Sequence, residues 1–425
     1  MLMSSVPSVS LVLSFEEARR VVEQQAAASS APQIETVDLL NAADRVLAEQ
    51  IIADRDLPPF PRSTRDGYAV RSADLSQLPA TLDVIAEIKA GETLERIPSN
   101  IPSGQAAAIM TGAPVPSGAD AVVMVEYTSE RDQRVEITRA VARGENIVPA
   151  GAEAREGSTL IPRGACLNDA AIALAASVGK SNLQVYKRPR VAVLTTGDEI
   201  VSINATPGPT QIRNSNSYSL AVQIAKAGGY PVLLPIAPDE PQALRRLVEE
   251  GFLKSDLLLL TGGVSMGRYD LVEQVLAELK AKFFFTGAKI QPGRPVIFGK
   301  CGAASSGRDA RETYFFGLPG NPVSTMVTFE LFARPMLEAL AGMSPRKLKF
   351  VHAKLKSEIR VKPGLKRFLP AILSGEFEGS QVELVRWQGS GDIAATATAN
   401  CYVVVPEERE HIKAGEYVPI LPRTM

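Results

Sequence analysis

The feature that most constrains the fold is a repeated pattern: an apolar strand, then a glycine-bearing loop, then a helix. It occurs at residues 191–199, 256–265 and 314–324. Continuous apolar strands that alternate with amphipathic helices are typical of a parallel sheet covered on both faces. Because the carboxyl ends of parallel strands meet at one edge of a sheet, we expect the three loops to lie together. Open α/β sheets bind their ligands at this edge.

The rest of the chain predicts further domains, because 425 residues are too many for one ordinary domain. Short β-branched runs between Pro and Gly turns fill the stretch before residue 148, and a similar texture returns near the C-terminus. The predicted division is a helical domain (1–50 and 149–187), a β-rich inserted domain (51–148), an α/β domain (188–343) and a C-terminal β-barrel domain (344–425).

Two helical segments flank the predicted insert. Residues 14–50 have a helical pattern that opens with a capping box of Ser14 and Glu17. A second helix is expected after Asn168, a good N-cap, with Gly179 as its stop. Since neither helix alone buries an apolar face, we expect the two to pack together.

Composition excludes several classes of protein. A formal net charge of −1 gives no bulk field that would attract nucleic acid or an anionic membrane. The three cysteines form no CxxC pair, which fits a reducing compartment, and two histidines are too few for a His-based metal site or a Ser-His-Asp relay. The apolar runs are too short to span a bilayer, and residues 6–13 lack the basic flank of a signal peptide. We therefore expect a cytoplasmic protein.

The loop at residues 317–324 suggests an anion site at a helix start. Gly320 allows a tight turn, Asn321 can cap, and Pro322 suits the first helical position, which leaves the next amides free for an anion. A bulky side chain at Gly320 should then block binding by closing the backbone approach and forbidding positive φ. The alternative is merely a well-capped helix.

The loop at residues 261–270 offers both hydroxyls and a carboxylate. Gly262 and Gly263 let the backbone pass close to a ligand, and the Ser265 hydroxyl can bond phosphate oxygens. Asp270 is suited to bind a divalent ion or to orient a polar ring; the alternative is an N-cap for the next helix.

The loop at residues 195–199 places two carboxylates, Asp198 and Glu199, directly after a strand. Adjacent acids there are costly unless paired or bound to a metal, which suggests Mg²⁺ or recognition of a polar ring; the alternative is a solvated surface pair. Further donors follow at residues 213–217. Arg294 suits bidentate contact with an oxyanion, or pairing with a carboxylate of the sheet.

Two loops of the predicted insert also carry polar side chains. Proline-rich residues 58–70 present Asp66 on irregular backbone, where function tends to reside, and Thr111 opens a second such loop. The alternative for the first loop is a rigid connector between domains.

Together, nine motifs in this order resemble the molybdopterin molybdenumtransferases, the family of MoeA and the gephyrin E domain. They are DGYAVR at 66–71, TGAPVP at 111–116, GENI at 144–147, TTGDEI at 195–200, NSNSY at 214–218, TGGVSMGRYD at 261–270, QPGRP at 291–295, GLPGNPVS at 317–324 and QGSG at 388–391. Any one motif is weak, whereas nine in order are specific.

The resemblance implies a multidomain α/β fold: a helical domain with an inserted elongated β-rich domain, a doubly wound molybdopterin-binding α/β domain and a C-terminal β-barrel. It implies a homodimer in which the part of one subunit that carries Asp66 completes the cleft of the other. The family's reaction takes adenylylated molybdopterin and molybdate, cleaves the phosphoanhydride with Mg²⁺, and releases AMP and molybdenum cofactor. A molybdopterin adenylyltransferase and molybdenum-enzyme acceptors are implied partners.

The resemblance also assigns roles to residues. The catalytic positions are Asp66, Thr111, Glu199 and Asp270, with Glu199 and Asp270 as metal ligands. The molybdopterin and its phosphate would be bound by Thr196, Gly197, Asp198, Asn214, Ser215, Asn216, Gly262, Gly263, Ser265, Arg294, Pro319, Gly320 and Asn321.

The sequence departs from the family pattern in three places. Residues 62–65 are Arg-Ser-Thr-Arg where many members have Asn-Ser-Ala-Met, and Glu153 stands for an aspartate after GENI. Gln291 and Arg294 occupy positions that are often Lys. Two other functions remain open: a molybdopterin adenylyltransferase, against which the insert and the barrel argue, and a non-catalytic scaffold, against which the retained acids argue.

Overall fold

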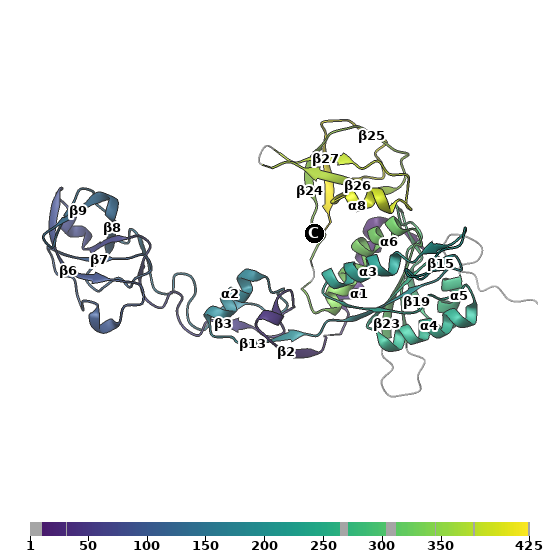
Figure 1. The fold of residues 1–425 in the computed structure, drawn as a ribbon, viewed down its shortest axis with the longest axis horizontal. Helices are drawn as coiled ribbons and strands as arrows, with labels where there is room; N and C mark the ends of the chain where they lie inside the picture. The colour runs from purple at the N-terminus through teal and green to yellow at the C-terminus, as the bar shows by residue number, and fades with distance from the viewer. Residues whose placement is uncertain are drawn as a thin grey trace, which may run out of the picture.

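The computed structural model describes residues 11–30, 32–263, 271–302, 312–344, 346–376 and 379–423. Figure 1 shows an elongated molecule: the β-rich insert at one end, a small module next to it, then an α/β unit with a C-terminal barrel beside it. The predicted fold class is therefore confirmed. No helix in these ranges is long and apolar enough to cross a membrane.

The α/β unit is built on a six-stranded sheet with the order β17-β14-β18-β23-β22-β19. The first four strands are parallel, β22 runs antiparallel to them, and the edge strand β19 runs antiparallel to β22. The strands are β14 (Arg190–Thr195), β17 (Tyr230–Leu233), β18 (Leu257–Thr261), β19 (Lys282–Phe285), β22 (Ile297–Gly302) and β23 (Glu312–Leu318). The helices are α3 (Asn216–Lys226), α4 (Pro241–Lys254), α5 (Leu271–Glu278), α6 (Pro322–Thr328) and α7 (Arg334–Leu340), with a π-helical turn, η5 (Phe329–Ala333), between the last two.

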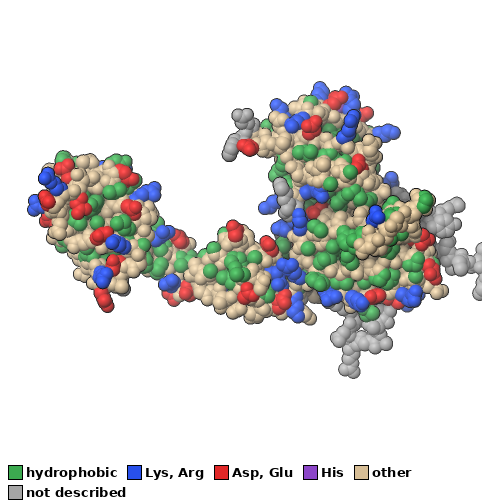
Figure 2. Space-filling model, in the orientation of Figure 1, with side chains coloured by type: hydrophobic (Ala, Val, Ile, Leu, Met, Phe, Trp, Pro, Cys, Tyr) green, Lys and Arg blue, Asp and Glu red, His purple; other side chains and the backbone are tan. Residues whose placement is uncertain are grey.

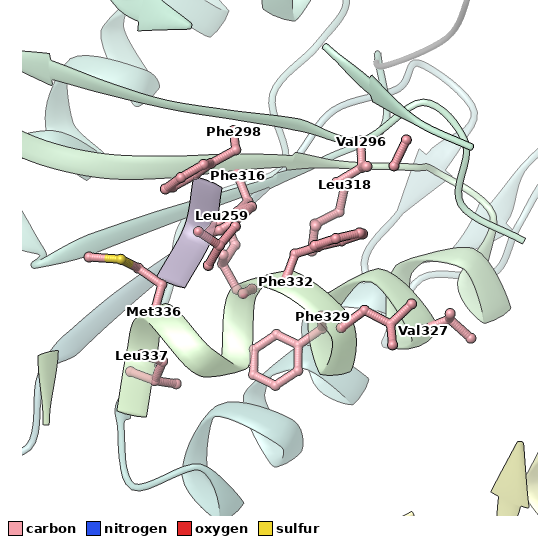
Figure 3. Packing of buried hydrophobic residues seen from close by; sticks show 14 of the residues in the cluster. Leu259, Val296, Phe298, Phe316, Leu318, Val327, Phe329, Phe332, Met336 and Leu337 are labelled. Carbon is pink, nitrogen blue, oxygen red and sulfur yellow. The ribbon is translucent and has the colours of Figure 1, made fainter. Parts of the chain in front are cut away.

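Both faces of the sheet are covered because successive strand residues point to opposite sides. Val191 and Val193 of β14 belong to the core under α3, α6 and α7, whereas Ala192 and Leu194 belong to the core under α4 and α5. In the first core the rings of Phe298 and Phe316 stack with centroids 4.4 Å apart. Figure 3 shows these two rings on the sheet, facing Phe332 and Met336 of the helical layer.

Helix α1 (Phe15–Ala27) begins where the sequence predicts but packs elsewhere. The capping box is confirmed: the Glu17 amide donates to Ser14 Oγ (3.2 Å), and the Ser14 amide donates to the Glu17 carboxylate (2.9 Å). The expected packing of this helix on the second one is wrong, because Phe15 and Val22 enter the core of the α/β unit beside α7. The helix also ends at Ala27, so the helical pattern to residue 50 was an overestimate.

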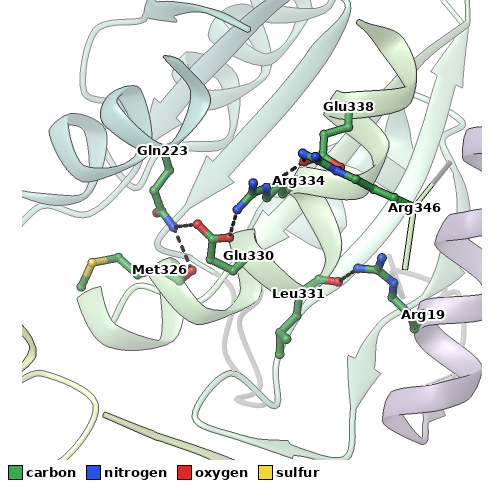
Figure 4. A network of polar contacts seen from close by, with 8 residues as sticks. All are labelled: Arg19, Gln223, Met326, Glu330, Leu331, Arg334, Glu338 and Arg346. Atoms are coloured by element: carbon green, nitrogen blue, oxygen red, sulfur yellow. Dashed lines mark hydrogen bonds and ion pairs between the residues drawn. The ribbon is translucent and has the colours of Figure 1, made fainter. Parts of the chain in front are cut away.

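Two further contacts join this N-terminal segment to the α/β unit. Strand β1 (Val12–Leu13) pairs with β20 (Gly287–Ala288). Arg19 is buried and donates from Nη1 to the Leu331 carbonyl (2.6 Å), which lies in the π-helical turn (Figure 4). The π-turn interrupts the regular helical ladder, so this guanidinium satisfies a carbonyl inside it.

The small module consists of residues 32–57 and 154–187. It contains β2 (Ile34–Asp38) paired with β13 (Asn182–Tyr186), β3 (Ile51–Ile52) paired with β12 (Thr159–Ile161), the 3₁₀ turn η1 (Leu40–Ala42) and α2 (Asp169–Ser177). Asn168 is confirmed as the N-cap of α2, since its Oδ1 accepts from the Ala171 amide (2.9 Å). Gly179, at φ +76°, follows the end of the helix as predicted.

The insert is a six-stranded sheet with the order β8-β5-β7-β6-β10-β9, next to a short ribbon, β4 with β11. Its strands are β4 (Arg62–Ser63), β5 (Gly67–Val70), β6 (Ala80–Ile88), β7 (Gln105–Ile109), β8 (Ala121–Met124), β9 (Thr128–Arg131), β10 (Arg134–Ile137) and β11 (Ile147–Val148). Short 3₁₀ turns are η2 (Ser72–Leu75), η3 (Leu94–Arg96) and η4 (Val125–Tyr127).

The C-terminal part is a closed barrel. Its strands follow the order β26-β27-β24-β30-β28, and β28 pairs back onto β26. One short strand from the α/β part, β21 (Ile290–Gln291), adds to β26 from outside. The elements are β24 (Val351–Leu355), β25 (Ile359–Arg360), β26 (Lys366–Ser374), β27 (Gln381–Leu384), β28 (Cys401–Val405), β29 (His411–Ile412), β30 (Tyr417–Pro422) and α8 (Ile393–Thr398).

Candidate functional site

The strand order reverses between β14 and β18. From β14 the chain passes through α3 to β17 on one side, and then through α4 to β18 on the other. Register places Thr195 beside Thr261, and Thr261 beside Leu318, at the carboxyl ends of the strands. The first residues of the three predicted loops therefore lie together where an open α/β sheet forms its binding crevice. Residues 264–270 of the second loop are outside the described ranges.

Asn216, the first residue of α3, ties two of these loops together. Its Nδ2 donates to Thr261 Oγ1 (2.9 Å) and to the Gly320 carbonyl (2.7 Å). Thr261 Oγ1 in turn donates to the Pro319 carbonyl (3.2 Å). The Asn216 side chain is 8% exposed, so these bonds form inside the protein.

The end of β14 is tied to the same helix. Thr195 Oγ1 lies 2.9 Å from Ser217 Oγ, and Asn214 Nδ2 donates to that same Ser217 hydroxyl (2.9 Å). The side-chain oxygen of Asn214, Oδ1, accepts from the Ser217 amide (3.1 Å). Asn214 therefore acts as a clamp within the protein, whereas Ser215 is exposed and free to meet a ligand.

One atom in this network stands out. Asn216 Oδ1 is buried and has no hydrogen-bond partner among the described residues. The amide cannot simply be flipped, because a carbonyl oxygen such as that of Gly320 must receive an N–H. An unsatisfied buried acceptor is costly, so the site fits a ligand that brings an N–H donor.

The two acids of the first loop are exposed. Asp198 Oδ1 accepts from the Asp239 amide (3.0 Å), and the Asp239 carboxylate accepts from Thr196 Oγ1 (2.7 Å). Exposure removes the desolvation cost that suggested a resident metal, so that argument from the sequence was wrong for this pair. Gly197 lies at φ +145°, and a Cβ there would lie 2.6 Å from Glu199 Oε2.

The ligand atoms available at this edge determine which kind of metal ion could bind there. No group of three or more His, Cys, Asp or Glu residues able to hold an ion occurs in the part of the chain that the structure describes. Magnesium, however, often takes only one or two carboxylates together with substrate phosphates and water. The exposed Asp198 and Glu199 fit that mode. Asp270 and Ser265 lie outside the described residues.

The helix start after Asn321 differs from the prediction. The Val323 amide, expected to be free, donates to the Ser390 carbonyl (3.0 Å), and Asn321 Nδ2 donates to Ser390 Oγ (2.9 Å). Ser390 belongs to the QGSG motif of the barrel, so a residue 67 positions later covers this helix end. The sequence alone indicates no role for Ser390, although QGSG is one of the nine motifs of the resemblance.

The positive φ that the sequence predicts at Gly320 is absent there and is found at Gly262. Gly320 is not at positive φ, and a Cβ there would make an ordinary 3.4 Å contact with Gly262 Cα. Gly262, at φ +89°, is the crowded position: a Cβ would lie 2.1 Å from the Thr196 carbonyl oxygen. The close backbone approach predicted at Gly262 therefore exists, but the group that approaches in the structure is Thr196.

Arg294 is exposed on the segment that follows β21. It makes no ion pair among the described residues, so pairing with a sheet carboxylate is not observed. The neighbouring Gly293 packs on α6, where a Cβ would lie 2.4 Å from Thr328 Cγ2. An exposed guanidinium beside α6 is available for an oxyanion.

The insert carries a second polar constellation. Asp66 Oδ1 accepts from the amide (2.6 Å) and from Oγ1 (2.8 Å) of Thr111. These hydrogen bonds, the backbone one first, lower the pKa of Asp66 below its ordinary value. Asp66 lines a hollow of about 480 Å³, whose other lining residues include the apolar Ile85 and Met110 and the acidic Glu87 and Glu130.

Two of the departures from the family pattern pair with each other. Arg62 Nη2 lies 2.8 Å from Glu153 Oε1, in a pair whose members are partly exposed. The two changes are therefore complementary, since the positive charge of Arg62 pairs with the negative charge of Glu153.

Within one chain, the structure does not bring the two constellations together. Asp66 directly precedes β5, and Thr111 follows its sheet neighbour β7. Figure 1 places β7 at the opposite end of the molecule from β15 (Ile200–Val201), which follows Glu199. Strand β15 pairs with β16 (Ile212–Arg213) beside α3. Asn216, Thr261 and Gly320 thus form one hydrogen-bonded cluster, and Asp66 with Thr111 forms another.

Known families match the chain in three consecutive regions. They are described as the MoeA N-terminal region (domains I and II), matching residues 13–179, a probable molybdopterin-binding domain, matching 192–339, and the MoeA C-terminal region (domain IV), matching 352–422.

Similar proteins extend over almost the whole chain. A molybdopterin molybdenumtransferase of Nostoc sp. is 34% identical and covers 91% of this chain and 88% of its own. One of Haemophilus influenzae is 33% identical, covering 92% and 94%. A crystal structure of the molybdopterin biosynthesis MoeA protein of Pyrococcus horikoshii has a TM-score of 0.70 at 31% identity, covering 97% and 99%. The chain belongs to the MoeA family.

Proposed function

We propose that this chain inserts molybdate into adenylylated molybdopterin, cleaving the phosphoanhydride and releasing AMP and molybdenum cofactor. The proposal is supported by relatives named molybdopterin molybdenumtransferase that match nearly the whole chain at 33–34% identity. The barrel and the insert favour it over a molybdopterin adenylyltransferase, whose α/β domain can stand alone.

The observation that carries the proposal is the unpartnered Asn216 Oδ1 at the reversal of strand order. A pterin ring presents N–H donors that could satisfy this oxygen. The hydroxyl of Ser215 and the guanidinium of Arg294 are exposed nearby on elements that border the same edge, and each can bond a phosphate or molybdate oxygen. The remaining phosphate-binding residues are proposed as the motifs assign them.

Asp198 and Glu199 would hold Mg²⁺ together with the substrate phosphates, and Asp270 would add a ligand. Such an ion neutralises charge that develops on the leaving phosphate. The protein's own part is to orient the anhydride on the rigid strand-end network and to keep the exposed acids within reach of it.

We propose further that the enzyme is a homodimer in which Asp66 and Thr111 of one subunit complete the cleft of the other. Exposed apolar side chains beside the cleft support this, because a second copy would cover them. They are Ile203, Ile212, Tyr218 and Val222. We place the reaction in the cytoplasm, between an adenylyltransferase that supplies the substrate and molybdenum enzymes that accept the product.

The test of activity is AMP release from adenylylated molybdopterin. The purified chain should release AMP only when molybdate and Mg²⁺ are both present, and Glu199→Ala or Asp270→Ala should lose most of that release. Release without molybdate would contradict insertion. Synthesis of the adenylylated form from ATP would instead identify an adenylyltransferase.

The dimer is tested by mixing two inactive variants, Asp66→Ala and Glu199→Ala. In a mixed dimer one cleft carries both lesions and the other carries neither, so random exchange should restore about a quarter of wild-type activity. Confirmed mixed dimers without any recovered activity would mean that each cleft is built from one chain.

A further inference from the structure

A cavity of about 330 Å³ lies where the small module meets the α/β unit. Val46 and Cys166 of the small module line one side, and Ala227 and Met343, at the ends of α3 and α7, line the other. Residues 187–188, which lead from β13 into β14, complete it. The cavity is thus at the amino end of β14, whereas the candidate site is at its carboxyl end.

Cations outnumber acids around this cavity. Its lining includes Arg45, Lys187, Arg188, Lys226 and Arg346, against the single acid Asp44. Figure 2 shows Lys and Arg side chains gathered over the junction of the two parts. A hollow lined by one sign of charge concentrates ions of the other sign.

Two of these cations form ion pairs with acidic side chains that do not line the cavity. Arg346 donates from Nε (3.1 Å) and Nη2 (2.6 Å) to Glu338, as Figure 4 shows. Arg45 is buried, pairs with Glu35 and donates to the Tyr186 carbonyl (2.8 Å). These two guanidinium groups are therefore fixed in place.

The ends of α3 and α7 explain only part of the charge. Cations favour helix C-termini, and Lys226, in the last turn of α3, serves that purpose. Lys187 and Arg188 belong to no helix and form no ion pair among the described residues. In that part of the chain the Lys187 ammonium group donates only to Gln33 Oε1 (3.1 Å). Stabilisation of the helix C-termini therefore does not explain why the linker carries these two adjacent positive charges.

We propose that this cavity binds a small polyanion of the phosphate type, held by Lys187 and Arg188. A guanidinium can bond two phosphate oxygens at once, and the volume lies in the range of small-molecule sites, about 300–1,000 Å³. Tyr186 also lines the cavity, and its ring packs against Gly342, where a Cβ would lie 2.3 Å from the ring. The ligand would join the small module to the linker that enters β14.

The cavity contains its own reporter. Cys166 lines it and is exposed, whereas Cys301 and Cys401 are buried. Burial around the sulfur, with the charge of Asp44, raises the pKa of the Cys166 thiol. A bound polyanion would cover this thiol and disfavour its thiolate, so reaction with maleimide should slow.

The experiment measures maleimide labelling of Cys166 in the full chain, with inorganic pyrophosphate or citrate at matched ionic strength. Pyrophosphate should slow labelling severalfold in the wild type and in the control variant Arg131→Gln, which removes an exposed cation of the insert. The same pyrophosphate concentration should have little effect in Arg188→Gln.

Three outcomes would overturn the proposal: labelling that pyrophosphate leaves unchanged, equal slowing in Arg188→Gln, or equal slowing by citrate. The last would make the site one for polyanions in general. The readout is independent of molybdenum insertion, because neither labelling nor its protection requires a working active site.

Discussion

The two constellations of this molecule are built in different ways. At the edge of the parallel sheet, Asn216 bonds to residues 45 and 104 positions away and is almost completely buried. In the insert, one exposed carboxylate, Asp66, accepts two hydrogen bonds from a single residue, Thr111. The first is a packed network that depends on sheet register, and the second is a local contact between two loops.

This difference predicts which substitutions should lower both stability and activity, and which should leave stability unchanged. A substitution in the packed network leaves buried groups unpaired or crowded, so it should lower the free energy of unfolding as well as activity. At the exposed contact, a group that loses its hydrogen-bond partner through a substitution can form a hydrogen bond with water instead. Such a substitution should change the properties of one carboxylate and leave the fold intact.

The largest effect is expected at Gly262. Gly262→Ala places a Cβ 2.1 Å from the Thr196 carbonyl at φ +89°. Crowding and strain together should lower the free energy of unfolding by about 3 kcal/mol. Gly320→Ala is the matched control, since its Cβ finds an ordinary contact; it should cost less than about 1 kcal/mol in denaturant unfolding. An equal decrease in the free energy of unfolding for both variants would contradict the conclusion that only Gly262 is crowded.

A smaller loss is expected for Asn216→Ala. Thr261 Oγ1 and the Gly320 carbonyl would each lose a buried partner. Such losses should cost about 2 kcal/mol in the free energy of unfolding. The exposed Asn204 provides a control, because Asn204→Ala should stay within about 0.5 kcal/mol of wild type. A wild-type unfolding midpoint for Asn216→Ala would place the network outside the packed core.

The smallest effect is expected for Thr111→Val, which removes the side-chain hydrogen bond to Asp66 and keeps the backbone one. The pKa of Asp66 should rise towards its ordinary value, as followed by carbon NMR of the carboxyl group during titration. A depressed folded pKa stabilises the protein above the unfolded pKa of about 3.9 and loses that effect as pH falls through the folded value.

The variant should therefore differ from wild type in stability only above that acidic range, and only slightly, because the carboxylate is exposed. Thr81→Val, at an exposed position of the same sheet, is the control and should leave the titration of Asp66 unchanged. A cooperative loss of fold in Thr111→Val would mean that the two constellations are not built differently after all.

Much of this architecture could be predicted because its signals are local. Strand periodicity and glycine spacing are read within ten residues, so the parallel sheet and the meeting of three loops followed from the sequence. The N-caps Ser14 and Asn168 are local too, and both are confirmed.

What failed depends on contacts between distant segments. An apolar helical face shows that α1 must pack, but not that its partner is α7. Only the folded position of the barrel reveals that Ser390 covers the Val323 amide. The φ angles of Gly262 and Gly320 likewise depend on how neighbouring loops approach, which a single residue type does not encode.

Strand β21 has a consequence for the order in which the molecule is completed. Ile290 and Gln291 precede their partners in β26, Lys366 and Arg367, along the chain. During synthesis from the N-terminus, the α/β unit can therefore fold first and offer β21 as a template edge. The barrel then assembles against that edge and delivers Ser390 to the start of α6. The C-terminal barrel, which is synthesised last, thus completes the surface of the α/β unit at the start of α6.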